Sequence, residues 1–205
     1  QQVKRIYNAN KAGHTGNLDV PATDLLPICL GEATKVSAYL LDSDKRYRAC
    51  CKLGSKTNTG DATGELLEQR PVADISIGDL NTVLQRFIGE IQQIPPMYSA
   101  LKQNGKRLYE LAYKGIEVVR EPRTITIKQL DLIKLDGDEF EIDVVCSKGT
   151  YIRTLCEDIG EALACGAHIL TLRRLGSGAF VESHMLTPEV LAEAAEQGET
   201  ALDSL

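Results

Sequence analysis

The chain has 205 residues, and 43% of them are hydrophobic, which suffices for a sizeable core in one large domain. No apolar run reaches the roughly 18 residues that a membrane-spanning helix requires, and the first residues lack the hydrophobic stretch of a secretory signal. We therefore expect a soluble, cytoplasmic protein without a membrane partner. The formal net charge of −6 argues against general binding to polyanions such as nucleic acid.

The negative charge is concentrated near the C-terminus. Residues 176–205 hold six carboxylates and no lysine or arginine, so the remaining chain is neutral overall. Cations gather between residues 95 and 123, at Lys102, Lys106, Arg107, Lys114, Arg120 and Arg123. This cluster agrees either with an ordinary solvated face or with a local surface for phosphate groups.

The six cysteines include no Cys-x-x-Cys pair, and most of them lie within apolar stretches. The three histidines do not stand near them at the short spacings of zinc sites. We interpret the thiols as reduced and buried, and we expect no metal site. The sequence also lacks the glycine motif of nucleotide-binding loops, so no cofactor is predicted.

The N-terminal part of the chain is expected to be irregular. Residues 1–7 have apolar side chains spaced like the end of an amphipathic helix. Residues 13–35 are interrupted by glycines and by Pro21, which predicts a loop, and a helix is expected over 32–41. The loop contains Asp19. Aspartate is common in turns, so a purely structural role remains open on local grounds.

The next segments predict regular elements that build a core. Residues 45–53 alternate as a strand, with Tyr47 on its apolar face. A polar, glycine-rich stretch containing Asp61 then predicts a loop, to which we assign no chemistry. Ser76 and Asp79 have the spacing of a capping box at the start of an amphipathic helix.

A segment rich in both cations and tyrosines follows. Two prolines at residues 95–96 open it, and residues 108–112 predict a short helix that Gly115 ends. Its basic side chains are interleaved with three tyrosines. Cations beside aromatic rings suit a surface that contacts phosphates and bases together.

The last part of the chain predicts a hairpin, two helices and a strand. Residues 123–135 and 139–146 alternate in polarity on either side of an Asp-Gly-Asp turn, which is typical of a β-hairpin. Helices are expected over 151–163 and 188–197, and a strand over 169–175.

Arg153 would lie in the first turn of the helix at 151–163, where the helix dipole disfavours a cation. A carboxylate partner from another part of the chain would explain its position. An ordinary surface ion pair is the alternative interpretation.

Three stretches together resemble one protein family. They are Gly-His-Thr-Gly-Asn-Leu-Asp at 13–19 with Gly-Glu-Ala-Thr-Lys at 31–35, Ser-Lys-Gly-Thr-Tyr-Ile-Arg-Thr at 147–154, and Cys-Gly-Ala-His-Ile-Leu-Thr-Leu-Arg-Arg-Leu at 165–175. The pattern resembles the bacterial TruB family of tRNA pseudouridine-55 synthases over nearly the whole chain. The strand and Lys-Pro-x-Gly motif that precede these stretches in the family, and the PUA domain that follows them, are not found in this sequence. We therefore expect a catalytic domain truncated at both ends.

The resemblance implies an α/β (α+β) fold, in which helices flank a mixed, mostly antiparallel sheet. Residues 1–205 would form one monomeric catalytic domain, with residues 95–120 inserted as an RNA-binding thumb. The implied reaction converts uridine 55 in the T-loop of tRNA to pseudouridine after the base has been flipped out of the loop. It needs neither a cofactor nor a metal.

The resemblance also implies the roles of individual residues. Asp19 matches the essential catalytic carboxylate, Arg153 its cationic partner, which would lower its pKa, and Tyr47 the tyrosine that stacks on the target uracil. His14, Tyr151 and Leu172 would contact the target nucleotide or its opened loop. The expected contacts to the rest of the RNA are Lys102, Lys106, Arg107 and Lys114 in the thumb, with Arg173 and Arg174 on a basic surface.

The first stretch departs from the family pattern in three places. Asn17 and Asp24 stand where threonine and glycine are usual, and Val20–Pro21 replaces Pro-Leu. Moving the proline changes which residue has its φ fixed, and glycine at position 24 could have served a positive φ. The second hypothesis is therefore a catalytically impaired tRNA-binding or tRNA-folding module of the same family.

Two further interpretations are weaker. A glycoside hydrolase needs a carboxylate pair, and no second acid stands at a recognisable spacing from Asp19, although Asp24 is near in sequence. The archaeal and eukaryotic relatives that use guide RNAs fit less well, because residues 31–35 and 97–102 look bacterial.

Overall fold

The structure is a computed structural model, and it describes residues 1–16 and 22–198. A seven-stranded sheet crosses its centre in the order β13-β12-β4-β11-β10-β7, with β2 beside β12. Its strands are β2 Ala22–Asp24, β4 Lys45–Leu53, β7 Gly89–Gln93, β10 Arg123–Asp136, β11 Glu139–Cys146, β12 Ala167–Ser177 and β13 Phe180–Val181. Every pairing is antiparallel except that of β2 with β12, which confirms the expected mixed, mostly antiparallel sheet.

The predicted β-hairpin is present as β10 and β11. Asp136 pairs with Glu139 across a tight turn. Gly137 in this turn has a φ of 60°, a conformation that glycine adopts without the steric penalty other residues carry. The predicted strand β4 then pairs with β11 on one side and β12 on the other, so it lies at the centre of the sheet.

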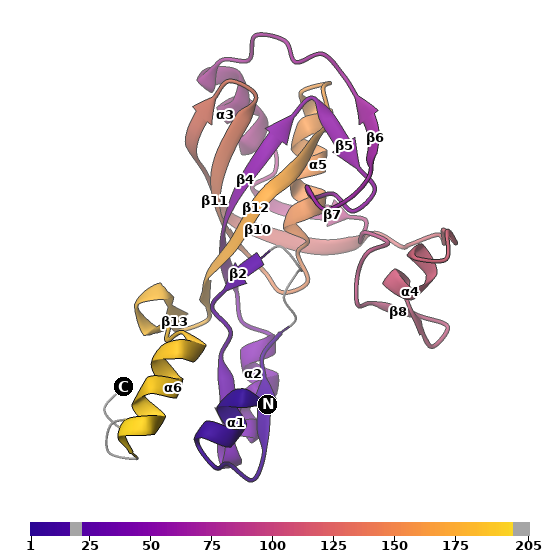
Figure 1. Ribbon diagram of the computed structural model, residues 1–205. Coiled ribbons are helices and arrows are strands. Elements are labelled where there is room, and N and C mark those ends of the chain that lie inside the picture. Colours follow the sequence, from indigo (N-terminus) through magenta and orange to yellow (C-terminus); the bar gives the residue numbers. More distant parts are fainter. Residues whose placement is uncertain (17–21, 199–205) are drawn as a thin grey trace.

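Two helices, α3 Ile77–Gln85 and α5 Ile152–Ala162, contribute to the core beside this sheet. The Ser76–Asp79 capping box forms as predicted, because the Asp79 N–H donates to Ser76 Oγ at 3.1 Å and the Ser76 N–H donates to Asp79 Oδ2 at 3.0 Å. Helix α5 packs closely against the start of β12 (Figure 1). A Cβ on Gly160 would lie 2.3 Å from the Ala167 nitrogen, so only glycine permits this approach. No helix in the described ranges is long and apolar enough to cross a membrane.

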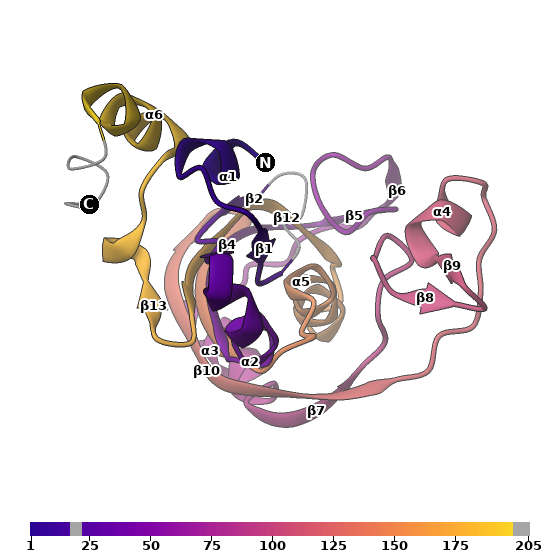
Figure 2. The same cartoon turned by 90° about the horizontal axis from the view of Figure 1, so that it is seen from below.

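The N-terminal elements lie beside the C-terminal helix at the opposite end of the molecule from α3 (Figures 1 and 2). They are α1 Gln2–Ile6, β1 Ala12–His14, β3 Ile28–Leu30, the 3-10 helix η1 Gly31–Val36 and α2 Ser37–Leu41, near α6 Pro188–Gln197. The prediction of an unbroken loop over 13–35 is wrong in part, because β1 pairs with β3 and β2 joins the main sheet. Each of these strands has only three residues, too few for alternation to be visible in the sequence.

Two smaller units project from the sheet. The hairpin of β5 Ser55–Thr57 and β6 Leu66–Gln69 follows β4. The thumb segment, residues 95–120, extends to one side of the sheet between β7 and β10 and carries β8 Lys102–Gln103, β9 Lys106–Arg107 and α4 Leu108–Ala112 (Figures 1 and 2). The short helix therefore occurs where it was predicted. A remaining 3-10 turn, η2 Glu182–His184, precedes α6.

Candidate active site

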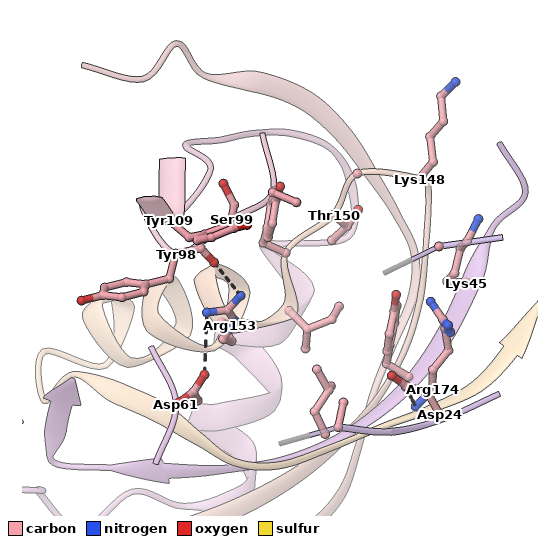
Figure 3. A pocket seen from close by; sticks show the side chains of 18 of the residues that line it. Asp24, Lys45, Asp61, Tyr98, Ser99, Tyr109, Lys148, Thr150, Arg153 and Arg174 are labelled. Carbon is pink, nitrogen blue, oxygen red and sulfur yellow. Dashed lines mark hydrogen bonds and ion pairs between the residues drawn. The ribbon is translucent and has the colours of Figure 1, made fainter. Parts of the chain in front are cut away.

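A cavity of about 730 Å³ opens between the main sheet, the start of α5 and the thumb segment. Strands β4 and β12 supply one wall, and residues 59–63, with the start of α5 and the thumb segment, supply the other (Figure 3). Its charged lining in the described part of the chain consists of Lys45, Arg107, Lys148, Arg153 and Arg174 against Asp24 and Asp61. The cavity is therefore cationic in a chain whose net charge is −6.

Arg153 lies in this wall, in the first turn of α5, and its side chain is 7% exposed. Its Nη1 lies 3.7 Å from Asp61 Oδ2 and donates to the Thr59 carbonyl at 2.9 Å, while Nη2 donates to the Tyr98 carbonyl at 3.0 Å (Figure 3). The prediction that Arg153 needs a carboxylate partner from elsewhere in the chain is confirmed by Asp61. The partner that the family resemblance named, Asp19, lies outside the described residues.

Asp61 is a site residue to which the sequence analysis assigned no chemistry. It is 4% exposed, and its Oδ1 accepts hydrogen bonds from the hydroxyls of Thr59 at 2.8 Å and Thr63 at 2.5 Å. The turn is joined to β12, because the Ala62 N–H donates to the Ile169 carbonyl at 2.8 Å. The sequence did contain one local signal for this site, namely the threonines two residues before and two residues after Asp61. Their hydroxyls are donors for the aspartate, and an ordinary polar surface loop does not need such a pair.

Gly60 lets the same turn approach α5. It has a φ of 74°, and a Cβ there would lie 3.3 Å from Arg153 Cβ and 3.4 Å from the Glu157 carboxyl carbon. A side chain at this position would make tight contacts with α5 and would strain a backbone of positive φ. Glycine therefore favours the close approach of this turn to Arg153.

Tyr47 and Arg174 lie together on the opposite wall. They are register partners between β4 and β12, which places both side chains on one face of the sheet. Burial raises the pKa of the Tyr47 phenol to about 12, although the neighbouring Arg174 guanidinium acts in the opposite direction. Tyr47 is therefore a neutral phenol at physiological pH.

Arg174 corrects an expectation, because it is 3% exposed and does not belong to a basic surface. Its Nε donates to the Leu25 carbonyl at 2.9 Å, and its backbone N–H donates to Asp24 Oδ1 at 2.8 Å. The reason is the alternation of β12, which turns Arg174 toward the cavity and Arg173 toward solvent. Arg173 is exposed, and its Nη2 lies 2.7 Å from Glu182.

Asp24 occupies the position where the family usually has glycine. It lies in β2 and does not have a positive φ, so no backbone strain follows from this departure. Its carboxylate accepts the hydrogen bond from the Arg174 backbone across the parallel pairing of β2 with β12. The negative charge thus helps to hold β2 against the wall of the cavity.

Lys45 is a buried cation at the edge of the same wall (Figure 3). Its Nζ donates to the carbonyls of Leu41 at 2.7 Å and Ser43 at 2.6 Å, at the end of α2. Burial, and then the charge of Arg174, lowers the pKa of Lys45. The side chain therefore anchors α2 to β4 while it lines the cavity.

Tyr151 and Leu172 also line the cavity, from the start of α5 and from β12. Tyr151 is held by the buried Gln93 side chain, whose Oε1 accepts from the Tyr151 N–H at 2.8 Å and whose Nε2 donates to the Tyr151 carbonyl at 3.1 Å. These two hydrogen bonds to the Tyr151 backbone fix the start of α5. Nothing in the sequence around Gln93 indicated this role.

The thumb segment brings aromatic rings to the rim of the cavity. Tyr98, Tyr109 and Tyr113 line it together with Arg107, whose Nη1 donates to Tyr109 Oη at 2.8 Å. The rings of Tyr98 and Tyr113 are 5.5 Å apart in an edge-to-face arrangement. The other predicted thumb cations, Lys102, Lys106 and Lys114, are exposed.

His14 is not among the residues that line the cavity. It lies on β1, exposed, and its Nδ1 is 2.6 Å from the Gly16 carbonyl. Among the described residues, no group of three or more His, Cys, Asp or Glu side chains could hold a metal ion. The six cysteines are free, and all except Cys50 are buried.

Two family models match the chain. Residues 4–152 match the TruB family pseudouridylate synthase N-terminal domain, and residues 153–205 match the tRNA pseudouridylate synthase B C-terminal domain. The tRNA pseudouridine synthase B of Enterobacter sp. (strain 638) is 58% identical over 200 residues, which are 98% of this chain and 63% of that protein. The protein of the same name from Escherichia coli (strain K12) is 57% identical over 199 residues, 97% of this chain and 63% of that protein.

Solved structures support the same assignment. A Cbf5-Nop10-Gar1 complex contains a chain that matches with a TM-score of 0.75 and 30% identity, over 98% of this chain and 52% of that one. An archaeal box H/ACA sRNP Nop10-Cbf5 complex matches with a TM-score of 0.70 and 28% identity, over 98% and 51% of the two chains. The chain spans 63% of the length of the curated relatives named above. Its two family matches together run from residue 4 to residue 205, and the chain belongs to the TruB family of pseudouridylate synthases.

Proposed function

We propose that the protein isomerises uridine to pseudouridine at position 55 in the T-loop of tRNA. The observation that carries this proposal is the cavity whose lining combines the buried Arg153–Asp61 pair with Tyr47 and Arg174. The curated relatives are named tRNA pseudouridine synthase B, and they support the choice of reaction and of RNA.

Asp19 is the proposed catalytic carboxylate. Gly16 and Ala22, the described residues on either side of the segment that carries it, both line the cavity. Arg153 belongs to the same lining, and a guanidinium near a carboxylate lowers its pKa by about 1–3 units. In this proposal Asp61 holds Arg153 in place, and Arg153 keeps Asp19 ionised at neutral pH.

The reaction rearranges one nucleotide without transferring a group to another molecule. The bond between N1 and C1′ breaks, the uracil turns within the cavity, and C5 bonds to C1′. The proton on C5 then passes to solvent, and N1 takes up a proton from solvent. Tyr47 stacks on the ring throughout. Because burial raises the pKa of Tyr47 to about 12, its hydroxyl is protonated at neutral pH before the nucleotide binds.

The flipped nucleotide needs a complementary surface around the cavity. Opening the loop costs a few kcal/mol, which contacts to the extruded base and to flanking phosphates offset. We assign these contacts to Tyr151 and Leu172 in the cavity and to the cations of the thumb segment outside it, with His14 holding the opened loop. Tyrosines interleaved with cations suit stacking and phosphate contact in one surface.

The test is a tritium-release assay on a T-stem-loop RNA whose target uridine carries tritium at C5. We expect tritium release and a pseudouridine product with the wild-type protein, and neither with Asp19→Ala. Asp131→Ala is a matched control, because Asp131 is an exposed aspartate on β10, away from the cavity lining. No product with the wild type, or full activity of Asp19→Ala, would contradict the proposal. Tight binding without turnover would favour the impaired binding module instead.

A further inference from the structure

The Arg174 guanidinium is fixed in the cavity wall and has unused hydrogen-bonding capacity. The side chain is 3% exposed, and its Nε is held by the Leu25 carbonyl at 2.9 Å. Its Nη2 is buried and has no hydrogen-bond partner in the described ranges of the chain. A buried donor without an acceptor destabilises the protein, so an acceptor on a bound ligand would remove that penalty.

We propose that Arg174 recognises the target uracil by donating a hydrogen bond from Nη2 to one of its two carbonyl oxygens. This inference rests on the proposed function and adds a recognition contact to it. Arg174 and Tyr47 are register partners on adjacent strands, and side chains at such positions lie next to each other on one face. A base stacked on the Tyr47 ring therefore presents an edge to Arg174.

The chemistry of the two pyrimidines explains why such a donor matters. Uracil has two carbonyl oxygens, O2 and O4, which accept hydrogen bonds. Cytosine has an amino group in place of O4, and an amino group cannot accept from a guanidinium. A guanidinium aimed at O4 favours uracil over cytosine, whereas one aimed at O2 fixes the orientation of either ring. The test below distinguishes these two oxygens.

The surroundings favour a base oxygen over a phosphate. Arg107 and Lys148 are the exposed cations of the cavity lining, and Figure 3 shows Lys148 pointing away from Arg174 and Asp24. A phosphate, which stays hydrated in the strand, meets such exposed cations first. Elsewhere in the cavity lining, the buried hydroxyls of Thr15 and Ser99 also have no hydrogen-bond partner in the described part of the chain. Buried polar atoms without partners suit a ligand that brings polar groups into the cavity.

The experiment measures the coupling between this side chain and single atoms of the RNA. Binding is measured in an Asp19→Ala background, so that turnover does not intervene. The T-stem-loop RNAs carry uridine, 2-thiouridine or 4-thiouridine at the target position, because sulfur accepts hydrogen bonds weakly, and a fourth RNA carries a methylphosphonate at the target phosphate. Each is measured with Arg174, with Arg174→Met and with Arg173→Met, the neighbour on the opposite face of β12.

We expect one of the two thio-RNAs to bind about tenfold more weakly than the uridine RNA when Arg174 is present. In Arg174→Met this ratio falls to within about twofold, because the donor has been removed. In Arg173→Met the ratio stays about tenfold, whatever the overall affinity. Arg174→Lys serves as the second variant if thermal melting finds Arg174→Met unfolded. It keeps the cation but loses the planar pair of donors, and we expect a reduced ratio.

Two results would overturn the inference. One is a thio-RNA ratio that persists unchanged in both Arg174 variants. The other is coupling of Arg174 to the methylphosphonate alone, which would make Arg174 a phosphate contact. Failure of the proposed function is separate, because it would appear as absence of tritium release by the otherwise unmodified protein on the uridine RNA.

Discussion

Replacing Glu157 with glutamine is expected to stabilise the protein at alkaline pH. Glu157 lies on α5 one turn after Arg153, with its carboxyl group against the Gly60 turn. Burial raises its pKa from 4.5 to about 7, and Asp158 adds to the effect, while Lys56 and Arg153 oppose it. A carboxylate that is harder to ionise in the folded state than in the unfolded state lowers the unfolding free energy at every pH at which it is ionised.

The magnitude follows from proton linkage. The folded-state pKa is raised, so the stabilisation that comes from protonated Glu157 is complete below pH 4.5 and is lost as the pH rises through about 7. A rise from 4.5 to about 7 corresponds to about 3 kcal/mol at pH values well above 7. Glutamine has the shape of the protonated acid and does not ionise. Glu157→Gln should therefore match the wild type near pH 4 and exceed its unfolding free energy above pH 7.

The assay is urea unfolding of both proteins at pH values from 4 to 8.5. Glu161→Gln is the matched control, because Glu161 lies on the same helix with its carboxylate bound by Arg70 and Lys56, which lower its pKa to about 2. A lowered pKa has the opposite sign, so Glu161→Gln should be less stable than the wild type by a nearly constant amount between pH 4.5 and 8.5. A difference between Glu157→Gln and the wild type that does not grow with pH would refute this reasoning.

Four further results are expected. Asp61→Asn should lower the unfolding free energy by about 1–3 kcal/mol in urea titrations, because it removes one negative charge beside the buried Arg153 cation. It should also slow single-turnover product formation at least about tenfold, and unchanged rates would separate Asp61 from catalysis. Tyr47→Ala should weaken binding of the stem-loop RNA about tenfold and Tyr47→Phe much less, as fluorescence anisotropy would detect, because the ring and not the hydroxyl stacks. Gly160→Ala should lower the melting temperature and destabilise by at least about 1–3 kcal/mol, since its Cβ would lie 2.3 Å from the Ala167 nitrogen. Gly78→Ala should cost less, because the first atom its Cβ would meet is Ser76 Oγ at 3.5 Å. Replacing Lys102, Lys106 and Lys114 by alanine should reduce the slope of log affinity against log salt concentration. The reduction should be about one unit for each phosphate that these lysines neutralise. An unchanged slope would exclude them from the RNA interface.

The regular elements were predictable because their signals are local. The hairpin of β10 and β11 is indicated by alternation on either side of one turn, and α3 by a capping box four residues long. The carboxylate partner for Arg153 followed from the helix dipole, which requires only the position of a cation within its own helix. In each case the decisive interactions lie within a few residues of one another.

The missed parts of the site involve residues far apart in the chain. Asp61 meets Arg153 only because a glycine turn is joined to β12 beside α5, and Gln93 meets Tyr151 across 58 residues. The short pairings of β1 with β3 and of β2 with β12 were not predicted either. A strand of three residues contains too few alternations to be identified from the sequence.

The sequence alone indicated that this chain belongs with the TruB proteins and where its main strands and helices lie, and it favoured a carboxylate partner for Arg153. Only the tertiary structure showed that Asp61 is an acid beside Arg153. It also placed two adjacent arginines of β12 on opposite sides of the strand, with Arg173 toward solvent and Arg174 in the cavity. Periodicity and capping depend on neighbours in the chain, whereas the chemistry of a buried charge depends on whatever folding brings within a few ångströms of it.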